Sequence, residues 1–358
     1  MKNISVSQKD EDISACKDIL LHNEFVAETE KIKKYLVKLT GQLDFFDKSH
    51  SLVGDRIRHI NSIKGSVFES LNKHFIAVWE VAKDFSKIEY AAHQTYYKNE
   101  LLILLATPPL NKRIYEKPLG YAGDYVMMNY YYNDKYEGNS SYEMLLHRYT
   151  LELPIARAHI NRKAYFKQRL KETIQQKPAL ARITSFGCGP AQEIIEFLQE
   201  NRTLNNVLFN CVDIEPSALQ HIKEKLKNIS VSESCRVVFH NLNILSIVRR
   251  SGVDENLKDQ DFIYAAGLFD YLEDKIARAV LKGMYSLLSN SGTLIIVNVH
   301  KKHNSRAYME LLGEWYLNLR NDKDLLLLTS NLKDTSEIRI EADTETSKNL
   351  YLVVKKQE

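Results

Sequence analysis

Apolar residues recur at three- and four-residue steps through the first hundred positions of the chain. In residues 30–46 the recurring positions include Leu36, Leu39 and Leu43, and residues 66–85 continue the same rhythm. Spacing of this kind places apolar side chains on one face of a helix. No proline interrupts this part of the chain. The pattern therefore predicts that the first 107 residues are helical.

Strand and helix patterns alternate along the second half of the chain. Apolar runs predict strands at residues 181–186, 206–214, 235–244, 261–269 and 293–299. Amphipathic stretches between them predict helices, and strands joined by helices imply right-handed crossovers and a doubly wound, mostly parallel sheet. Two alternating runs, residues 336–343 and 349–356, predict an antiparallel hairpin at the sheet edge. The expected fold class is α/β, a Rossmann-like sheet with an N-terminal helical domain.

Two further segments have amphipathic patterns. Residues 274–292 predict a strong helix with one apolar face, formed by Ile276, Ala279, Val280, Gly283, Met284, Leu287 and Leu288. Trp315 and Tyr316 are expected on another amphipathic helix, where they line an apolar channel or belong to the core.

Residues 108–150 follow neither pattern. They contain three glycines and nine of the twenty tyrosines of the chain. One interpretation is a loop whose tyrosines pack across surfaces, because a tyrosine is half apolar and half hydrogen-bonding. The other is a lid or substrate wall, because long ordered loops are usually functional. Both interpretations stay open at this point.

Composition narrows the class of protein. The 358 residues are 44% hydrophobic and 27% charged, with a formal charge of +3, so a dedicated nucleic-acid binder is not expected. The N-terminus lacks the order of a secretory signal, and no apolar run approaches the length of a transmembrane span. The cysteines, Cys16, Cys188, Cys211 and Cys235, form no CxxC pair, so neither a zinc site nor a disulfide framework is indicated. We expect a cytosolic protein with reduced cysteines.

Candidate binding residues follow the predicted strands, because ligands of open α/β sheets lie at the carboxyl ends of the strands. The turn Gly187-Cys188-Gly189-Pro190 follows the first strand. Asp213 ends the second strand, where a carboxylate can hold the two hydroxyls of a ribose. Asn243 follows the third strand and could contact an adenine edge. Gly267 stands at the tip of the fourth.

The glycine turn is an incomplete dinucleotide fingerprint, because Gln192 stands where the third glycine is expected. This departure disfavours a nicotinamide or flavin cofactor, whose pyrophosphate needs the full motif. It is compatible with S-adenosylmethionine, which has no phosphates. The alternative is that the glycines only form a tight turn between a strand and a helix.

Four segments together carry a resemblance to a known family: "KPLGYAGDYVMMN", "YEGNSSYEMLLHR", "SFGCGPAQEI" and "AGLFDYLED". They resemble a bacterial family of class I S-adenosylmethionine-dependent methyltransferases, some of whose members are associated with 3-hydroxy fatty acid methyl esters used as cell-density signals. The resemblance runs from about residue 90 to the C-terminus. The "PLGYAGDY" segment is the most specific part, and the front hundred residues resemble the family only in being helical.

The class I pattern implies S-adenosylmethionine as cofactor and assigns its contacts. Gly187 and Gly189 would line its methionine and ribose, Asp213 would bind the ribose, and Ala266 and Gly267 would face the methionine end. The implied cofactor-binding residues are Tyr121, Arg162, Gly187, Gly189, Pro190, Asp213, Ile214, Asn243, Ala266 and Gly267. No metal ligand is expected.

The acceptor side has several candidates. The candidate catalytic residues are Tyr121, Asp124, Tyr125, Asp270, Tyr271 and His300. Each has a structural alternative: Asp124 can cap a turn, and His300 can be a hydrogen-bonded structural residue. Arg157 and Arg162 could bind a carboxylate, either the substrate's or the cofactor's, or pair with acidic side chains.

The chemistry separates the possible functions. A carboxylate acceptor is already deprotonated and needs no base, whereas a hydroxyl or amine acceptor does. The first hypothesis is O-methylation of the carboxylate of a (3-hydroxy) fatty acid or a similar small apolar acid. The second is O- or N-methylation of another small metabolite with a general base. The third is a non-catalytic S-adenosylmethionine sensor or scaffold.

The expected domains are a helical cap over residues 1–107, a lid or linker over 108–150 and a cofactor-binding catalytic domain over 151–358. A homodimer is a candidate assembly. The expected partner is a small molecule rather than a nucleic acid or a membrane.

Overall fold

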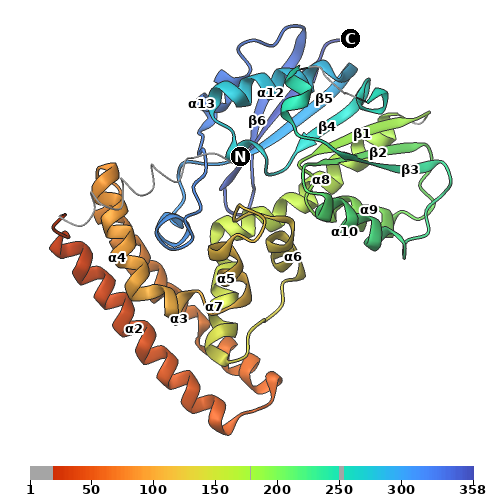
Figure 1. Cartoon of the computed structure of the whole chain (residues 1–358). Helices are drawn as coiled ribbons and strands as arrows, with labels where there is room; N and C mark the ends of the chain where they lie inside the picture. Colours follow the sequence, from red (N-terminus) through yellow and green to blue (C-terminus); the bar gives the residue numbers. More distant parts are fainter. Residues whose placement is uncertain (1–18, 178, 250–253) are drawn as a thin grey trace. The chain divides into compact units, whose positions relative to one another are not determined.

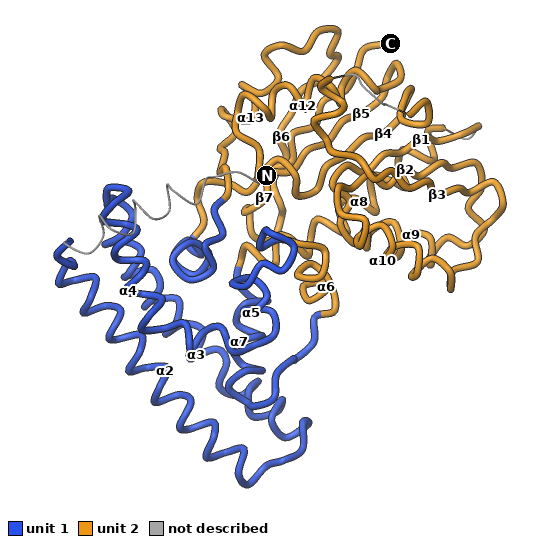
Figure 2. The backbone as a smooth tube through the Cα atoms, in the orientation of Figure 1, with its two compact units in different colours: residues 1–123, 134–153, 304–316 blue, residues 124–133, 154–303, 317–358 orange. Residues whose placement is uncertain are grey.

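A computed structural model describes residues 19–177, 179–249 and 254–358, which form two compact units (Figure 2). Unit 1 contains the described residues up to Gly123, together with Asp134–Leu153 and Asn304–Tyr316. Unit 2 contains Asp124–Asn133, Pro154–His303 and Leu317–Glu358. This grouping differs from the three continuous segments expected from the sequence. Cys16 lies outside the described residues.

Unit 1 is helical. Its elements are α2 (Asn23–Ser49), α3 (Val53–Ala82), α4 (Lys87–Leu105), α5 (Pro109–Glu116), α7 (Ser141–Glu152) and the π-helix η4 (Ala307–Leu312). The predicted helical rhythm of the front section is confirmed, since Leu36, Leu39 and Leu43 are buried on one face of α2. Nothing long and apolar enough to cross a membrane occurs among the helices of the described ranges.

A buried polar cluster joins the distant segments of unit 1. Tyr308 of η4 accepts a hydrogen bond from Asn111 Nδ2 at 2.6 Å and lies 2.8 Å from Thr150 Oγ1. Thr150 also donates to Asn111 Oδ1 at 2.8 Å. All three side chains are buried, so each satisfies polar groups that would otherwise be left without partners.

The loop expected over residues 108–150 is a wrong prediction. That stretch forms α5, α6 (Tyr125–Asn133) and α7. Pro109 occupies the first turn of α5, where its missing N–H has no intrahelical partner to lose. The Ser140 hydroxyl accepts from the N–H of Glu143 and so begins α7. A proline in the first turn marks the beginning of α5, and side-chain caps mark the beginnings of α6 and α7.

Unit 2 is built on a seven-stranded sheet (Figure 1). The strands are β1 (Ala181–Phe186), β2 (Val207–Asp213), β3 (Cys235–Asn241), β4 (Gln260–Ala265), β5 (Leu288–Val299), β6 (Thr335–Ala342) and β7 (Asn349–Lys356). Their order is β3-β2-β1-β4-β5-β7-β6. The first five strands run parallel, and β7 is antiparallel to both β5 and β6. The Rossmann-like fold prediction is confirmed, with β7 inserted inside the sheet and β6 at the edge.

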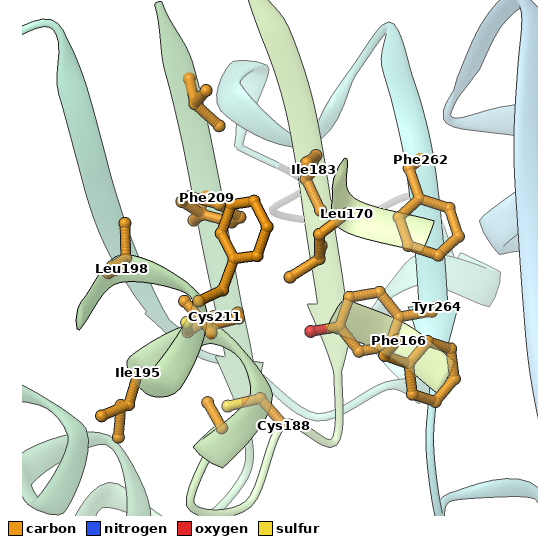
Figure 3. Packing of buried hydrophobic residues seen from close by; sticks show 14 of the residues in the cluster. Phe166, Leu170, Ile183, Cys188, Ile195, Leu198, Phe209, Cys211, Phe262 and Tyr264 are labelled. Carbon is orange, nitrogen blue, oxygen red and sulfur yellow. The ribbon is translucent and has the colours of Figure 1, made fainter. Parts of the chain in front are cut away.

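Helices cover both faces of this sheet. They are α8 (Pro154–Gln176), α9 (Gln192–Glu200) and α10 (Pro216–Leu226) on one face, with α11 (Leu245–Arg249), α12 (Asp274–Ser286) and α13 (Asp322–Leu328) on the other. Figure 3 shows the first core, where Phe166 and Leu170 of α8 pack with Phe209 of β2 and Tyr264 of β4. The helix α6 packs beside α8. Three-residue 3₁₀ turns lie at Glu255–Leu257 and Phe269–Tyr271.

Two other predictions need correction. The buried face of α12 carries Ala277, Val280, Leu281 and Met284, whereas Ile276 is exposed, so the predicted face was rotated by about one position. Trp315 and Tyr316 lie beyond the end of η4 and not on a helix.

Candidate functional site

The turn after β1 brings backbone close to the carboxyl end of β2. Gly187 and Gly189 have φ angles of 61° and 54°, a region that favours glycine. The N–H of Cys188 donates to Val212 O at 3.1 Å, and the N–H of Gly189 donates to Asp213 Oδ2 at 2.8 Å. The turn is therefore fixed to the end of β2 through two backbone N–H groups.

Ala191 shares the left-handed conformation of these glycines. Its φ and ψ are 45° and 41°, and it stands at the N-cap of α9. For a residue with a Cβ this conformation costs about 1–2 kcal/mol. We expect Ala191→Gly to raise the free energy of unfolding by about 0.5–1 kcal/mol in urea denaturation, because glycine removes most of that strain.

A matched control for this substitution is Ala279→Gly within α12. Here glycine should lower the free energy of unfolding by about 1 kcal/mol, because it only adds backbone entropy to the unfolded chain. A loss of stability in both variants would contradict strain at Ala191.

Asp213 is placed where the sequence predicted, and its carboxylate is partly engaged. Besides Gly189, it accepts the N–H of Glu215 on Oδ1 at 2.9 Å. Burial raises the pKa of Asp213, and the backbone donors oppose that rise. The Ile214 N–H is a third donor to this carboxylate, which keeps the capacity to accept about one more hydrogen bond, from a ligand hydroxyl. Ile214, the next residue, is 53% exposed and presents an apolar surface beside it.

Asn243 has a local structural role. Its Oδ1 accepts the N–H of Leu245 at 2.9 Å and its carbonyl accepts the N–H of Ser246, so it begins α11. Its predicted contact with an adenine edge stays a prediction.

Arg162 of α8 extends its guanidinium to the end of β4. Nη1 donates to Ala266 O at 2.6 Å, and Nη2 lies 3.5 Å from Met128 Sδ of α6. A Cβ at Gly267 would lie 3.2 Å from Nη1, so glycine there gives the guanidinium room.

The Arg162 side chain is 6% exposed and its Nε has no hydrogen-bond partner. Burial raises the pKa values of Asp270 and Glu193, and the charge of Arg162 opposes that rise, so these two carboxyls lie close enough to interact with it without a direct ion pair. The unused Nε–H is a donor that an anion could accept.

Asp270 lies in the 3₁₀ turn after β4 and is buried. Its Oδ1 accepts the N–H of Val299 at the end of β5 at 2.7 Å. Its carbonyl accepts the N–H of Asn318 at 2.7 Å. Burial raises the pKa of Asp270 to about 6, against the opposing effects of the Val299 donor and of two arginines. Tyr271 follows it and is half-buried.

The raised pKa of Asp270 predicts a specific pH dependence of stability. The folded state holds this proton more tightly than the unfolded state, whose carboxyl has a pKa of about 4. The stabilisation is complete below pH 4 and is lost as the pH rises through about 6. We expect wild type to lose about 3 kcal/mol relative to Asp270→Asn between these limits, because asparagine keeps the acceptor without titrating. Urea denaturation of both proteins from pH 4 to 7 measures it, and a pH-independent difference would contradict it.

Arg320 holds the segment that carries Asp270. Its Nη1 donates to Phe269 O at 2.9 Å and to Asn298 Oδ1 at 2.6 Å. Its Nη2 donates to Leu272 O at 2.6 Å and to Asp274 Oδ1 at 2.8 Å. The side chain is 2% exposed. One guanidinium therefore fixes the turn after β4 to the end of β5.

The other candidates are held by local interactions. Asp124 is buried and its Oδ1 accepts the N–H of Met127 at 2.8 Å, so it begins α6. Nδ1 of His300 accepts the N–H of Lys302 at 2.9 Å. Arg157 lies 3.6 Å from Glu345 Oε1 in an ion pair. The structural alternatives considered for these residues are thus present, while their catalytic roles stay predictions.

The "GYAGDY" segment divides between the two units. Tyr121 belongs to unit 1, whereas Asp124 and Tyr125 belong to unit 2. A Cβ at Gly189 would lie 4.0 Å from Tyr125 Cβ, so Tyr125 stands beside the glycine turn. Its ring centroid lies 5.5 Å from that of His221 on α10. Unit 2 therefore brings Tyr125, the glycine turn, Asp213 and Arg162 to the same end of the sheet.

The fold of this chain is similar to that of a solved structure. A Bordetella parapertussis protein described as a possible exported protein superposes with a TM-score of 0.56. The alignment covers 84% of this chain and 97% of that one, at 14% identity. The likeness is one of fold. No protein-family model matches the sequence, and no curated protein matches it either.

Two further structures are methyltransferases by name. Magnesium protoporphyrin IX methyltransferase from Synechocystis PCC 6803, with bound S-adenosylmethionine, has a TM-score of 0.41 and 11% identity, over 57% of this chain and 84% of that one. The N-methyltransferase NodS from Bradyrhizobium japonicum has a TM-score of 0.38 and 14% identity, over 55% of this chain and 97% of that one.

Sequence reasoning missed three residues of this site. The left-handed Ala191 follows the recognised turn directly, and a GxGxA spacing was the signal that could have indicated it. Met128, which contacts Arg162, lies in a run that was treated as loop. Arg320 had no signal, because its partners lie 22 to 51 residues away in the chain. In the part of the chain that the structure describes, no group of three His, Cys, Asp or Glu side chains could hold a metal ion.

Proposed function

We propose that the protein is a class I methyltransferase that uses S-adenosylmethionine. The observation that carries the proposal is the turn whose Gly189 N–H is bound by Asp213, with a buried arginine, whose Nε has no hydrogen-bond partner, at the neighbouring strand end. A nucleoside with an amino-acid tail fits this set. The glycine backbone suits a close approach, the remaining acceptor capacity of Asp213 suits a ribose hydroxyl, and Arg162 suits a carboxylate.

The residues also fit the chemistry of methyl transfer. The cofactor's sulfonium supplies the methyl group, so the protein needs to align the acceptor in line and exclude water. Arg162 would hold the carboxylate of the methionine moiety, and Tyr125 would cover the glycine turn. Ala266 and Gly267, at the end of β4, would lie beside the methionine moiety and hold Arg162 there through the Ala266 carbonyl.

A carboxylate is the acceptor group that the site supports best. The candidate bases Asp124, Asp270 and His300 each accept a backbone hydrogen bond, so each has a structural role. An acceptor that is deprotonated at neutral pH needs none of them. We therefore propose methylation of the carboxylate of a small apolar acid, with a (3-hydroxy) fatty acid as the first substrate class to test.

A second candidate is methylation of a hydroxyl or an amine, with Asp270 as general base. It is favoured by the pKa of Asp270, about 6, which lies close to the optimum for proton transfer at neutral pH. The two candidates differ in what the Asp270→Asn variant does to turnover.

S-adenosylhomocysteine release in the presence of a fatty-acid panel, with and without 3-hydroxyl groups, tests the proposal. Mass spectrometry identifies the product. A methyl ester, formed equally by wild type and Asp270→Asn, is the expected result. Turnover of a hydroxyl or amine acceptor that Asp270→Asn abolishes would establish the second candidate. Binding of S-adenosylmethionine without turnover on any acceptor would instead favour a sensor or scaffold.

A further inference from the structure

A cavity lies on the helical face of unit 2, between α6, α9 and α10. Its volume is about 220 Å³. Asn129 and Asn133 of α6, four residues apart, line one side. Gln192 and Gln199 of α9, seven residues apart, line another. These spacings put each pair on one face of its helix. Four carboxamides therefore converge on one space, each able to donate and accept hydrogen bonds.

The third side of the cavity supplies the only formal charge in its lining. His221 and Lys225, one turn apart on α10, face the same space, and Ile195 of α9 completes it. Lys225 has no carboxylate of the described residues within 4 Å. Burial lowers the pKa of His221, so its imidazole is neutral at neutral pH and can donate or accept. No Asp or Glu lines the cavity, so the exposed Lys225 is the one formal charge in its lining.

We propose that this cavity binds a small anion that carries hydroxyl groups, a sugar phosphate or a hydroxylated carboxylate. Lys225 is the counter-charge, and the carboxamides bind the hydroxyls, which also both donate and accept. The volume is smaller than the roughly 300–1,000 Å³ of pockets for drug-sized ligands, so a small metabolite fits better. Gln192 already donates to Glu196 at 3.1 Å, which leaves its carbonyl oxygen available to accept from a ligand hydroxyl.

The cavity is connected to the glycine turn through α6. Tyr125, the first residue of α6, stands beside Gly189 and packs on the ring of His221. Asn129 of the same helix lies 3.4 Å from His221 Nε2. A ligand that bridges Asn129 and Lys225 therefore holds α6 against α10, with Tyr125 over the turn. This part rests on the proposed function: the anion raises the affinity for the cofactor, and the cofactor raises the affinity for the anion by the same factor.

Isothermal titration calorimetry on the full-length protein tests the site with ribose 5-phosphate, gluconate and neutral ribose. The expected result is saturable binding of ribose 5-phosphate or gluconate, which identifies the phosphate or the carboxylate as the anion, and no binding of ribose. Lys225→Gln should weaken that binding at least tenfold. Lys227→Gln is the matched control, because this exposed lysine at the end of α10 removes the same charge outside the cavity lining, and its effect should stay within twofold.

The bound anion should tighten S-adenosylhomocysteine binding about fivefold in wild type and not in Lys225→Gln, a coupling of ordinary size. Absence of saturable binding by both anions, or equal losses in Lys225→Gln and Lys227→Gln, overturns the site. Anion binding with unchanged S-adenosylhomocysteine affinity overturns the coupling. Failure of the protein to bind S-adenosylhomocysteine at all would reject the proposed function instead, because anion binding is measured without it.

Discussion

Arg320→Ala is expected to lower the free energy of unfolding by about 3–5 kcal/mol, which is the range for removing one partner of a buried, hydrogen-bonded ion pair. The substitution leaves Phe269 O, Leu272 O and Asn298 Oδ1 without the donor that they share. Each buried acceptor that loses its partner costs about 1–3 kcal/mol. Urea denaturation followed by circular dichroism measures the loss.

The matched control is Arg278→Ala on α12. This exposed arginine donates one long hydrogen bond, 3.3 Å to Asp274 O, and its removal should change stability by less than about 0.5 kcal/mol. Arg320→Lys keeps the charge but cannot reproduce the fork, so it should fall between the two. Equal, small effects of Arg320→Ala and Arg278→Ala would show that the turn after β4 is held by other contacts.

Arg162→Met is expected to change stability and ligand affinity in opposite directions. Methionine has a similar length and removes a buried cation that forms no direct ion pair with a described carboxylate, so the free energy of unfolding should rise by about 1 kcal/mol. The affinity for S-adenosylhomocysteine should fall about 30-fold, because a charge-assisted hydrogen bond is worth about 1.5–3 kcal/mol. Denaturation and isothermal titration calorimetry measure the two effects.

A second ligand sharpens this test. 5′-Methylthioadenosine lacks the amino-acid carboxylate, so its affinity should be the same in Arg162→Met and wild type. Arg157→Met on the same helix should leave both affinities within twofold, because Arg157 already pairs with Glu345. If Arg162→Met lowered stability and both affinities together, Arg162 would be a structural residue and not the carboxylate partner.

The sheet was predictable because its signals are local and strong. Five apolar runs at the spacing of strand and crossover helix, followed by two alternating runs, determine a Rossmann-like order with few alternatives. The helix α6 was not predictable in this way. Its nine residues bury Met127, Met128 and Tyr131 and have no clear polar face, so the period of 3.6 that reveals a helix is missing. An aspartate such as Asp124 can cap a helix or lie in a turn, so it indicates a helix only when the helix is already known.

Which face of a helix is buried depends on tertiary contacts that the sequence pattern does not contain. On α12, both Ile276 and Ala277 begin acceptable apolar stripes, and the neighbour decides between them. A Cβ at Gly283 would lie 2.8 Å from Cγ2 of Ile247, so this glycine lets α11 pack closely against α12. The pattern of a single helix contains no information about that close approach, and the sequence therefore predicted a face about one position away.

In the candidate site, too, positions set by strand order were predictable and those set by tertiary contacts were not. Gly187, Asp213 and Gly267 were predictable because parallel strands put their carboxyl ends together, whatever the details of packing. The state of Arg162 was not, since two outcomes, an ion pair or an unsatisfied cation, are compatible with one sequence. Its partners Ala266 and Met128 come from segments 104 and 34 residues away. Only the packed structure shows that Asp270 and Glu193 interact with its charge without forming a direct ion pair.

The composition of unit 1 has a consequence for biosynthesis. Residues 304–316, which supply Tyr308 to Asn111 and Thr150, are translated some 150 residues after the rest of that unit. On the ribosome the first helices emerge long before their last polar partner exists. The nascent chain therefore exposes an incomplete helical core throughout synthesis of β1 to β5, the interval in which chaperone binding should be strongest. Unit 1 is therefore completed only after most of unit 2 has been translated.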